Sequence, residues 1–348
     1  MFLSVGVRAV VNIEALNMVE SIGNFVRHRK AMIIFKQNDR YVIRNTPVVS
    51  GESIAHAYQW WVAGIARERY KEVPLCEYCE RGEFLKHCDT SLFGTKKWEE
   101  DLKKKIESKK YDPHEIEKEI VKNCIVEDLG GFLYPGVIPV KRTSVFQNSY
   151  MVPTFDSLSG GLVSIDPQFH ARHSPTRSAK QEQEEAVGQS IYYVETGSAI
   201  YSLTFNLDLN AIGRTRMIKL EDVVGEDERK RRIGIALDAL AIMLDSKIFG
   251  AKLSRFTPVI HYETIIAAVS QYPPFVVSAP ASPDFIDTTI SRANAFKELF
   301  GSEVNLFGLG DSLPKEIEVA SNVLELLNKV KGRVLGEKDE AVRCEGSH

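Results

Sequence analysis

The chain has 348 residues, a formal net charge of −3, 44% hydrophobic residues and 26% charged residues. This composition is typical of a soluble globular protein, and the length allows one large domain with an insertion, or two domains. The mildly acidic total does not point to nucleic acid, so a nucleic-acid site would have to rest on a local basic patch. No apolar run reaches the length of a membrane helix and no secretory signal is present, which predicts a cytoplasmic protein. Five cysteines in so long a chain do not indicate a disulfide framework.

The N-terminal segment predicts a strand followed by a basic hairpin. Apolar and polar residues alternate over residues 3–13, which is typical of a half-buried strand. After a polar turn at 17–24, residues 27–44 predict a short hairpin with six Lys or Arg residues and one acid. This local excess of positive charge would attract an anionic partner.

A helix is expected directly after the hairpin. Ser50 is a favourable N-cap, and Gly51 would let a ligand approach the free backbone N–H groups closely. A helix N-terminus beside a basic hairpin is suited to binding phosphate, although an ordinary capped helix with a solvated charged loop explains the same residues. His56 and Gln59 lie off the apolar stripe of this helix, toward solvent or a ligand.

Residues 70–145 predict an inserted subdomain, because regular core patterning stops before them and resumes after them. A Lys/Glu-rich helix at about 96–122 is typical of a solvated face with i,i+4 ion pairs.

Cys76 and Cys79 have the spacing of two ligands that share one turn around zinc. Cys124, together with Cys88 or His87, would complete a tetrahedral site. A second CxxC motif is missing, so the pattern is incomplete, and nothing nearby supplies a base for a catalytic role. The cofactor that this region suggests is a structural zinc ion.

Residues 141–190 predict a long loop or flexible arm, and loops of this length are usually functional or disordered. No acidic residue occurs between Asp166 and Glu182. Cations mixed with aromatic and imidazole rings suit single-stranded nucleic acid, whose bases stack and whose phosphates pair, whereas a disordered polar loop is the alternative. The residues of this kind are Phe169, His170, Arg172, His173, Arg177 and Lys180.

The C-terminal half alternates strands and helices. The expected elements are a hairpin with strands at 191–195 and 199–209 joined by a Thr196-Gly197 turn, a helix at 229–246, a strand at 275–278, helices at 284–300 and 314–331, and a disordered tail after Gly336. A basic turn at 250–255 follows the first of these helices, and its Lys252 and Arg255 could clamp a phosphate, although basic turns after helices are common.

The order of strand, helix, insertion, two strands, helix and strand predicts an α+β fold. It is the split β-α-β topology of a ferredoxin-like or RRM-like sheet with large insertions. The aromatic signature of an ordinary RRM's third strand is absent, so stacking of bases on an open sheet face is not supported.

No arrangement of residues supports catalysis. His28, His56, His170 and His173 are candidates for a general base, but no motif places one of them beside an acid and a nucleophile. The sequence contains no Walker loop, no GxSxG or HExxH motif and no dinucleotide fingerprint. The residues alone therefore predict a protein that binds an anionic partner and is not an enzyme.

Five segments, at 12–24, 27–31, 47–59, 76–88 and 250–258, resemble the backbone subunit of Cascade, the type I CRISPR surveillance complex, in its archaeal form (the Csa-two or DevR-like branch of the seventh Cas family). The resemblance extends over about residues 1–330. It implies a modified RRM-like (ferredoxin-like) palm with an inserted helical finger subdomain and a flexible thumb loop. The implied boundaries are 1–69 and 146–335 for the palm, about 157–190 for the thumb loop within it, 70–145 for the finger and 336–348 for a disordered tail.

The resemblance also implies a function. Several copies would polymerise along one single-stranded CRISPR RNA, hold its phosphates and present its bases to target DNA. They would also contact other Cascade subunits. The resemblance implies no association with a membrane and no required cofactor. Phosphate contacts carry no sequence information, which suits a protein that must hold any guide, and base pairing by the guide would supply specificity. Many family members carry a second basic residue where this chain has Leu253. The implied RNA-binding residues are Arg27, His28, Arg29, Ser50, Gly51, His56, His170, Arg172, His173, Arg177, Lys252, Ser254 and Arg255.

Two other functions are compatible with the sequence. The first is an RNA-processing endonuclease on a related RRM-like fold, whose metal-independent cleavage would disappear when His28, His170 or His173 is changed to alanine. The second is a zinc-stabilised interaction protein that has no affinity for RNA.

Overall fold

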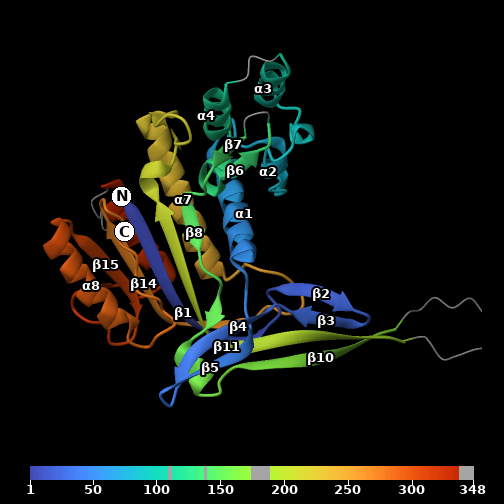
Figure 1. The fold of residues 1–348 in the computed structure, drawn as a ribbon, viewed down its shortest axis with the longest axis vertical. Helices are drawn as coiled ribbons and strands as arrows, with labels where there is room; N and C mark the ends of the chain where they lie inside the picture. The colour runs from blue at the N-terminus through green and yellow to red at the C-terminus, as the bar shows by residue number, and fades with distance from the viewer. Residues whose placement is uncertain (109–111, 137–138, 174–188, 337–348) are drawn as a thin grey trace, which may run out of the picture.

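The computed structural model describes residues 1–108, 112–136, 139–173 and 189–336, and it shows a mixed α/β fold built on one large sheet (Figure 1). The strands of this sheet are β1 (Phe2–Glu14), β2 (Met18–Ile22), β3 (Phe25–His28), β8 (Phe146–Asn148), β9 (Val152–Pro153), β10 (Ser164–His173), β11 (Gln189–Asp208), β14 (Val259–Ser270), β15 (Val304–Gly310) and β16 (Glu318–Val319). In the described residues the main path runs β16-β15-β14-β1-β11-β3-β2, and β8, β9 and β10 also pair with β11. The expectation that helices combine with a sheet is confirmed at this level.

Helices cover both faces of the sheet (Figure 1). They are α1 (Gly51–Arg69), α2 (Glu77–Arg81), α3 (Lys97–Glu107), α4 (Pro113–Asn123), α5 (Ile125–Gly130), α6 (Phe155–Ser159), α7 (Glu226–Ser246), α8 (Phe285–Phe300) and α9 (Val323–Leu335), with 3-10 turns η1 (Thr90–Leu92) and η2 (Leu209–Ala211). The larger core lies between the sheet and α1, α7 and α9, and the smaller core lies under α8. Three further hairpins are β4 (Lys30–Gln37) with β5 (Arg40–Pro47), β6 (Phe132–Tyr134) with β7 (Val140–Arg142), and β12 (Arg214–Thr215) with β13 (Glu221–Asp222).

Strand β1 lies between β11 and β14 and is buried on both faces, so the expectation of a half-buried strand is wrong. Its apolar residues enter the larger core as the alternation predicts. The opposite face is also covered: the Ser4 hydroxyl donates to Asn206 Oδ1 at 2.7 Å and accepts the Val277 N–H at 3.1 Å. Arg8 on the same face forms an ion pair with Asp156 at 2.8 Å. The small and polar residues of β1 are therefore buried with partners instead of being exposed to water.

The hairpin expected around Thr196-Gly197 does not form, because β11 is one continuous strand. Its N-terminal half pairs with β10 and its C-terminal half pairs with β1. An added Cβ at Gly197 would lie 2.7 Å from Glu14 Oε1 and 3.0 Å from Pro47 Cβ, so this glycine allows close packing and makes no turn. The described part of 141–190, expected to be a long loop, instead contains β8, β9, α6 and β10, and together β10 and β11 make an arm that projects from the sheet (Figure 1).

Helix α1 starts where the sequence predicts. The Ser50 Oγ accepts the Ser53 N–H at 3.3 Å, which confirms Ser50 as the N-cap. The helix buries its apolar stripe against α7, and the Tyr58 hydroxyl donates to the Ala236 carbonyl at 3.1 Å. Gln59 is buried instead of facing solvent or a ligand, because the helix is covered on this side by the insertion.

Two C-terminal elements differ from the expectation. Residues 275–278 are extended and buried but form no strand, because their N–H groups bond to side chains, as in the Phe275 N–H to Ser270 Oγ bond of 3.0 Å. The last helix, α9, begins after Asn322 instead of near Pro314, and the Asn322 side chain accepts the Glu325 N–H at 2.9 Å. The start of the helix is therefore set by the capping side chain of Asn322, and Pro314 does not occupy its first turn.

Residues 70–145 contain α2 to α5 and the β6–β7 hairpin, which lie above the sheet in Figure 1. The single Lys/Glu-rich helix expected at 96–122 is two helices, since Asp112 caps α4 and Pro113 begins it. These helices are not entirely solvated, because they share a small core with the hairpin. Its buried apolar residues are Leu102, Ile116, Ile120, Val121, Phe132, Tyr134 and Val140.

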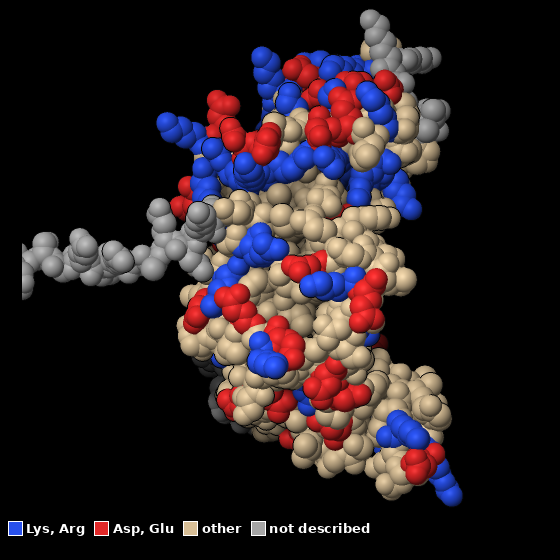
Figure 2. Space-filling view, turned by 90° about the vertical axis from the view of Figure 1, so that its left-hand side faces the viewer, with Lys and Arg blue, Asp and Glu red and all other residues tan. Residues whose placement is uncertain are grey.

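Charge is unevenly distributed over the molecule. On the face drawn in Figure 2, Lys and Arg side chains gather in the upper part, at the level of the insertion, with Asp and Glu side chains between them. The remainder of this face shows scattered charges of both signs and no continuous basic stripe. Among the described residues, no helix combines the length and the apolar character needed to cross a membrane.

Candidate nucleic-acid interface

The dipeptide Leu16-Asn17, directly after β1, joins the three segments that the sequence predicts to bind phosphate. The Arg29 N–H donates to the Asn17 carbonyl at 2.8 Å, and the Ser50 N–H donates to the Asn17 Oδ1 at 2.7 Å. The Ala251 N–H donates to the Leu16 carbonyl at 2.8 Å. The basic hairpin, the start of α1 and the basic turn therefore meet at one place, although they lie far apart in the sequence. We call this place the Leu16-Asn17 junction.

Gly250 allows the basic turn to approach the junction. Its φ is 81°, and an added Cβ would lie 2.9 Å from both the Cβ and the carbonyl oxygen of Leu16. The turn that follows exposes Lys252, Ser254 and Arg255 to solvent. Within the described residues no ion pair neutralises either cation. Their charge is therefore available to an anionic ligand.

The arm reaches the same turn through Tyr192 of β11 and His170 of β10. Arg255 Nη1 donates to the Tyr192 hydroxyl at 3.2 Å. The His170 ring stacks on Tyr192 with 5.1 Å between ring centroids, and it meets the edge of Phe256 at 5.5 Å. The structure thus brings His170 of the arm beside Arg255 of the basic turn.

Two nitrogen atoms of the expected binding residues are buried without a hydrogen-bond partner in the described residues: Arg29 Nε and His170 Nε2. Buried polar atoms are almost always paired with protein or water. Unpaired nitrogen atoms at the junction and on the arm are what a polar ligand bound there would satisfy.

A hollow of about 340 Å³ lies beside the junction, and the sequence did not indicate it. His56 and Trp60 of α1 line one side, and Leu253 lines another. Trp60 is 44% exposed, which is unusual for so large an apolar ring. The available sequence signal for this hollow was a histidine followed four residues later by a tryptophan, which places both rings on one side of a helix. Aromatic and imidazole rings beside cations suit the stacking of unpaired bases.

Ser50 and Gly51 position this surface instead of presenting an open N-terminus. Ser50 is buried, and its side chain caps the helix. The space beside Gly51 is filled by Asn148, whose Nδ2 donates to the Gly51 carbonyl at 2.7 Å. An added Cβ at Gly51 would lie 2.9 Å from that nitrogen, so the close approach predicted for a ligand is made by the chain itself.

His28 does not face a ligand, which corrects the expectation that it contacts RNA. Its side chain has no exposed surface; Nε2 lies 2.8 Å from Glu14 Oε2 and Nδ1 lies 2.7 Å from the Arg29 carbonyl oxygen. Burial alone would lower the pKa of His28, but the hydrogen bond and ion pair with Glu14 outweigh burial and raise it. The imidazole therefore fixes the end of β3 against the end of β1.

The remaining expected residues lie along the arm and the hairpin. Arg27 is 43% exposed and pairs with Glu20 at 3.2 Å, a surface pair that a phosphate can displace. Arg172 and His173 belong to β10, but only their backbone is described. Arg177 lies outside the described residues.

Three of the four cysteines expected to bind metal come together. Cys76, Cys79 and Cys124 are buried and form a group with Glu127 in which the potential ligand atoms lie within 4.8 Å of one another. Cys88 is exposed and does not belong to this group, so its expected place as a ligand is wrong. The chain turns outward after His87, which is buried and bonds to Glu127.

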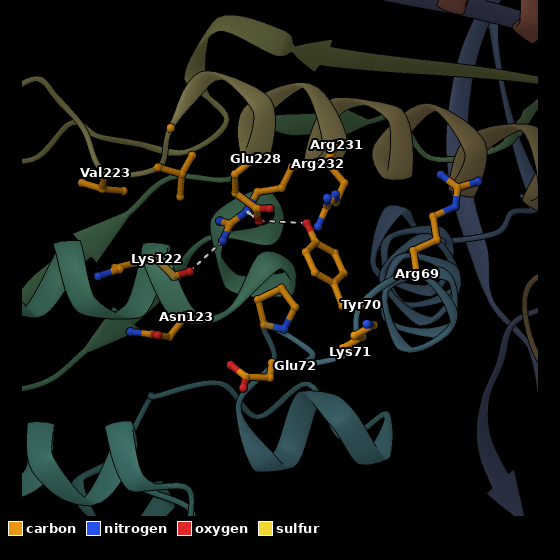
Figure 3. A pocket seen from close by; sticks show the side chains of 13 residues that line it. Arg69, Tyr70, Lys71, Glu72, Lys122, Asn123, Val223, Glu228, Arg231 and Arg232 are labelled. Atoms are coloured by element: carbon orange, nitrogen blue, oxygen red, sulfur yellow. Dashed lines mark hydrogen bonds and ion pairs between the residues drawn. The ribbon is translucent and has the colours of Figure 1, made fainter.

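A second hollow, of about 800 Å³, lies where the insertion meets the sheet domain (Figure 3). Figure 3 shows the Tyr70 hydroxyl and the Arg232 guanidinium converging on Glu228, at 2.8 Å each. Arg232 is buried and also bonds to Asp128 at 2.9 Å, so its charge is already neutralised. The Arg232 guanidinium is therefore not free to bind an anionic ligand in this hollow.

Comparison with known proteins gives a consistent result. The model of the family described as CRISPR-associated negative auto-regulator DevR/Csa2 matches residues 5–290. The CRISPR-associated protein Cas7/Csa2 1 of Saccharolobus solfataricus is 35% identical over 308 residues, which covers 88% of this chain and 90% of the relative. A second protein of that organism, CRISPR-associated aCascade subunit Cas7/Csa2 2, is 33% identical over 340 residues, covering 94% and 99%.

The fold is similar to chains in two solved structures. A chain of a CRISPR RNA-guided surveillance complex superposes with a TM-score of 0.52 at 8% identity, and a chain of such a complex in a pre-nicking state superposes with 0.56 at 10% identity. Both matches cover 96% of this chain and 100% of the other chain. At such identity the likeness shows a shared fold alone.

Proposed function

Because the chain belongs to the Cas7/Csa2 (DevR/Csa2) family of CRISPR-associated proteins, we propose that it is a non-catalytic backbone subunit that binds a CRISPR RNA in a type I surveillance complex. Several copies would line up along one guide, contact other subunits of the complex and present the guide to target DNA. One of the relatives is named as an aCascade subunit, which supports assembly into such a complex.

The observation that carries the proposal is the Leu16-Asn17 junction. It gathers Arg29, Lys252 and Arg255 from two segments that are distant in the sequence, and it places His170 beside them. Cations of this kind bind phosphates without reading base identity. His56 and Trp60 in the adjoining hollow would stack on bases. A protein that must hold any guide needs these two kinds of contact.

The parts of the fold then take family roles. The large sheet with α1 and α7 would be the modified RRM-like palm, residues 1–69 and 146–335. The arm of β10 and β11, with the segment beyond its described end, would be the thumb, within about 157–190. Residues 70–145 would be the inserted finger. The tail at 337–348 lies outside the described residues.

The test is a titration of purified protein with an end-labelled single-stranded guide-like RNA, read on native gels at several salt concentrations. We expect a ladder of shifted species with intact RNA. For single strands, each phosphate contact contributes about −0.7 to the slope of log K against log salt. The double variant Lys252→Ala/Arg255→Ala should therefore flatten the slope by about 1.4 and weaken binding for every RNA sequence alike.

The matched control is Arg292→Ala/Lys297→Ala, which removes one arginine and one lysine from the exposed side of α8. It should leave the slope unchanged. Equal effects of the two double variants would contradict a phosphate site at the junction. Cleaved RNA on a denaturing gel would instead favour the endonuclease.

A further inference from the structure

We propose that Cys76, Cys79, Cys124 and Glu127 bind a structural zinc ion that fastens residues 70–145 to the sheet domain. All four side chains are buried, and their ligand atoms lie within 4.8 Å of one another. Structural zinc sites typically have four ligands rich in cysteine, such as three cysteines and one histidine, and zinc also accepts a carboxylate oxygen as a ligand. The inference is independent of RNA binding.

The spacing of the group fits a tetrahedral ion. A Zn–S distance of about 2.3 Å places two sulfur ligands roughly 3.8 Å apart, so small side-chain movements bring the four atoms onto one ion. Cys76 and Cys79 lie on one short turn, where the Cys79 N–H donates to the Cys76 Sγ at 3.4 Å. Cys124 and Glu127 are three residues apart at the start of α5, which places both on one side of it.

The surroundings orient the oxygen ligand. His87 Nδ1 lies 2.8 Å from Glu127 Oε1, and the His87 N–H donates to Glu127 Oε2 at 3.2 Å. The other ring nitrogen of His87 lies 3.5 Å from Glu99 Oε1. Carboxylate ligands of metals are usually held in this way by a second layer of hydrogen bonds.

The charge of the pocket favours a cation. The three thiols lie around the buried carboxylate of Glu127, which the ring of His87 contacts at 2.8 Å. Thiols bind a metal as thiolates, so a divalent ion would balance the negative charge that they acquire in this buried place.

The position of the site explains what the ion would do. Its ligands come from two places in the insertion, the start of α2 and the start of α5. The three cysteines belong to the same core as Ile54 and Tyr58 of α1. An ion at this point would cross-link α2 to α5 where the insertion packs on α1.

The first measurement is the metal content of the full-length wild-type protein, made without a metal-affinity step and kept reduced. We expect about one zinc per chain by elemental mass spectrometry and by native mass spectrometry. The metal-free protein titrated with Co²⁺ should develop the visible bands of tetrahedral cobalt and a thiolate-to-cobalt charge-transfer band.

Variants locate the ligands. Cys76→Ser and Cys124→Ser should each lose the zinc and the charge-transfer band, whereas the matched control Cys88→Ser should keep both, because Cys88 is exposed outside the group. His87→Gln should weaken zinc binding about 10- to 100-fold without changing the stoichiometry.

Wild-type protein that contains no zinc and gives no tetrahedral cobalt spectrum would overturn the proposal, even if the serine variants fail to fold. Loss of zinc in Cys88→Ser equal to that in Cys124→Ser would refute the assigned ligand set.

Discussion

Replacing Gly250 by alanine should displace the basic turn without removing any charge. The residue has a φ of 81°, and left-handed backbone costs an L-residue roughly 1–2 kcal/mol. The new Cβ would also lie 2.9 Å from the Leu16 carbonyl oxygen, which accepts the Ala251 N–H. Overpacking of this kind costs about 1–3 kcal/mol, so the free energy of unfolding should fall by roughly 2–5 kcal/mol in total.

The chain offers a control with the same backbone and no collision. Gly301, at the end of α8, has a φ of 63°, and a Cβ there would meet nothing within 4 Å. Gly301→Ala should therefore cost only the backbone contribution of roughly 1–2 kcal/mol. The difference between the two variants measures the collision with Leu16.

Urea unfolding followed by circular dichroism gives the two free energies, and the native-gel titration gives RNA affinity. We expect Gly250→Ala to lose RNA affinity about as much as Lys252→Ala/Arg255→Ala, and Gly301→Ala to bind like the wild type. Equal destabilisation of both glycine variants, or full RNA affinity in Gly250→Ala, would refute the view that the Leu16-Asn17 junction positions the turn.

Two more predictions concern buried charges. His28 has a raised pKa, so its ion pair with Glu14 stabilises the fold fully below the unfolded-state pKa of about 6.5 and is lost as pH rises through the folded-state pKa. The stability difference between wild type and His28→Gln, measured as urea unfolding free energy, should therefore shrink from pH 6 to pH 9. Asp128→Asn leaves Arg142 and Arg232 buried without their shared counter-charge, and urea unfolding should show a loss of about 3–5 kcal/mol.

Each of these predictions has an outcome that contradicts it. A stability difference for His28→Gln that grows with pH would mean that the neutral ring, not the ion pair, stabilises this site. For the aspartate, the control is Glu303→Gln, which breaks the exposed pair with Lys297 and should cost far less than Asp128→Asn. A similar loss in both carboxylate variants would show that burial does not strengthen the Asp128 interactions.

Local patterns in the sequence predicted those elements whose cause is local. The strand at residues 3–13 and the N-cap at Ser50 depend on nearby residues, and both are confirmed, whereas the burial of the second face of β1 depends on distant residues. The dipeptide Thr196-Gly197 has the composition of a turn. In the structure Gly197 instead leaves room for Glu14, which is distant in the sequence. Whether a glycine serves a turn or close packing depends on its neighbours in space, which periodicity does not reveal.

The candidate site was predicted only in part, because several of its features also depend on residues that are distant in the sequence. The cations of the basic turn were identified from composition, and the structure leaves Lys252 exposed. The burial of His28 depends on a carboxylate fourteen residues earlier, and the role of Leu16-Asn17 depends on three remote N–H groups. Glu127 had no sequence signal as a metal ligand, because an acid is an ordinary residue on a helix.

The continuity of β11 has a mechanical consequence. At about 3.3 Å per residue, its 20 residues trace a path of roughly 66 Å, and Figure 1 shows the strand bending where it passes from the arm into the sheet. Gly197 lies near this bend, where the main partner of β11 changes from β10 to β1, and it is packed against Glu14 and Pro47. Because one continuous strand belongs to both parts, a displacement of the arm would reach Glu14 at the end of β1, two residues before the Leu16-Asn17 junction.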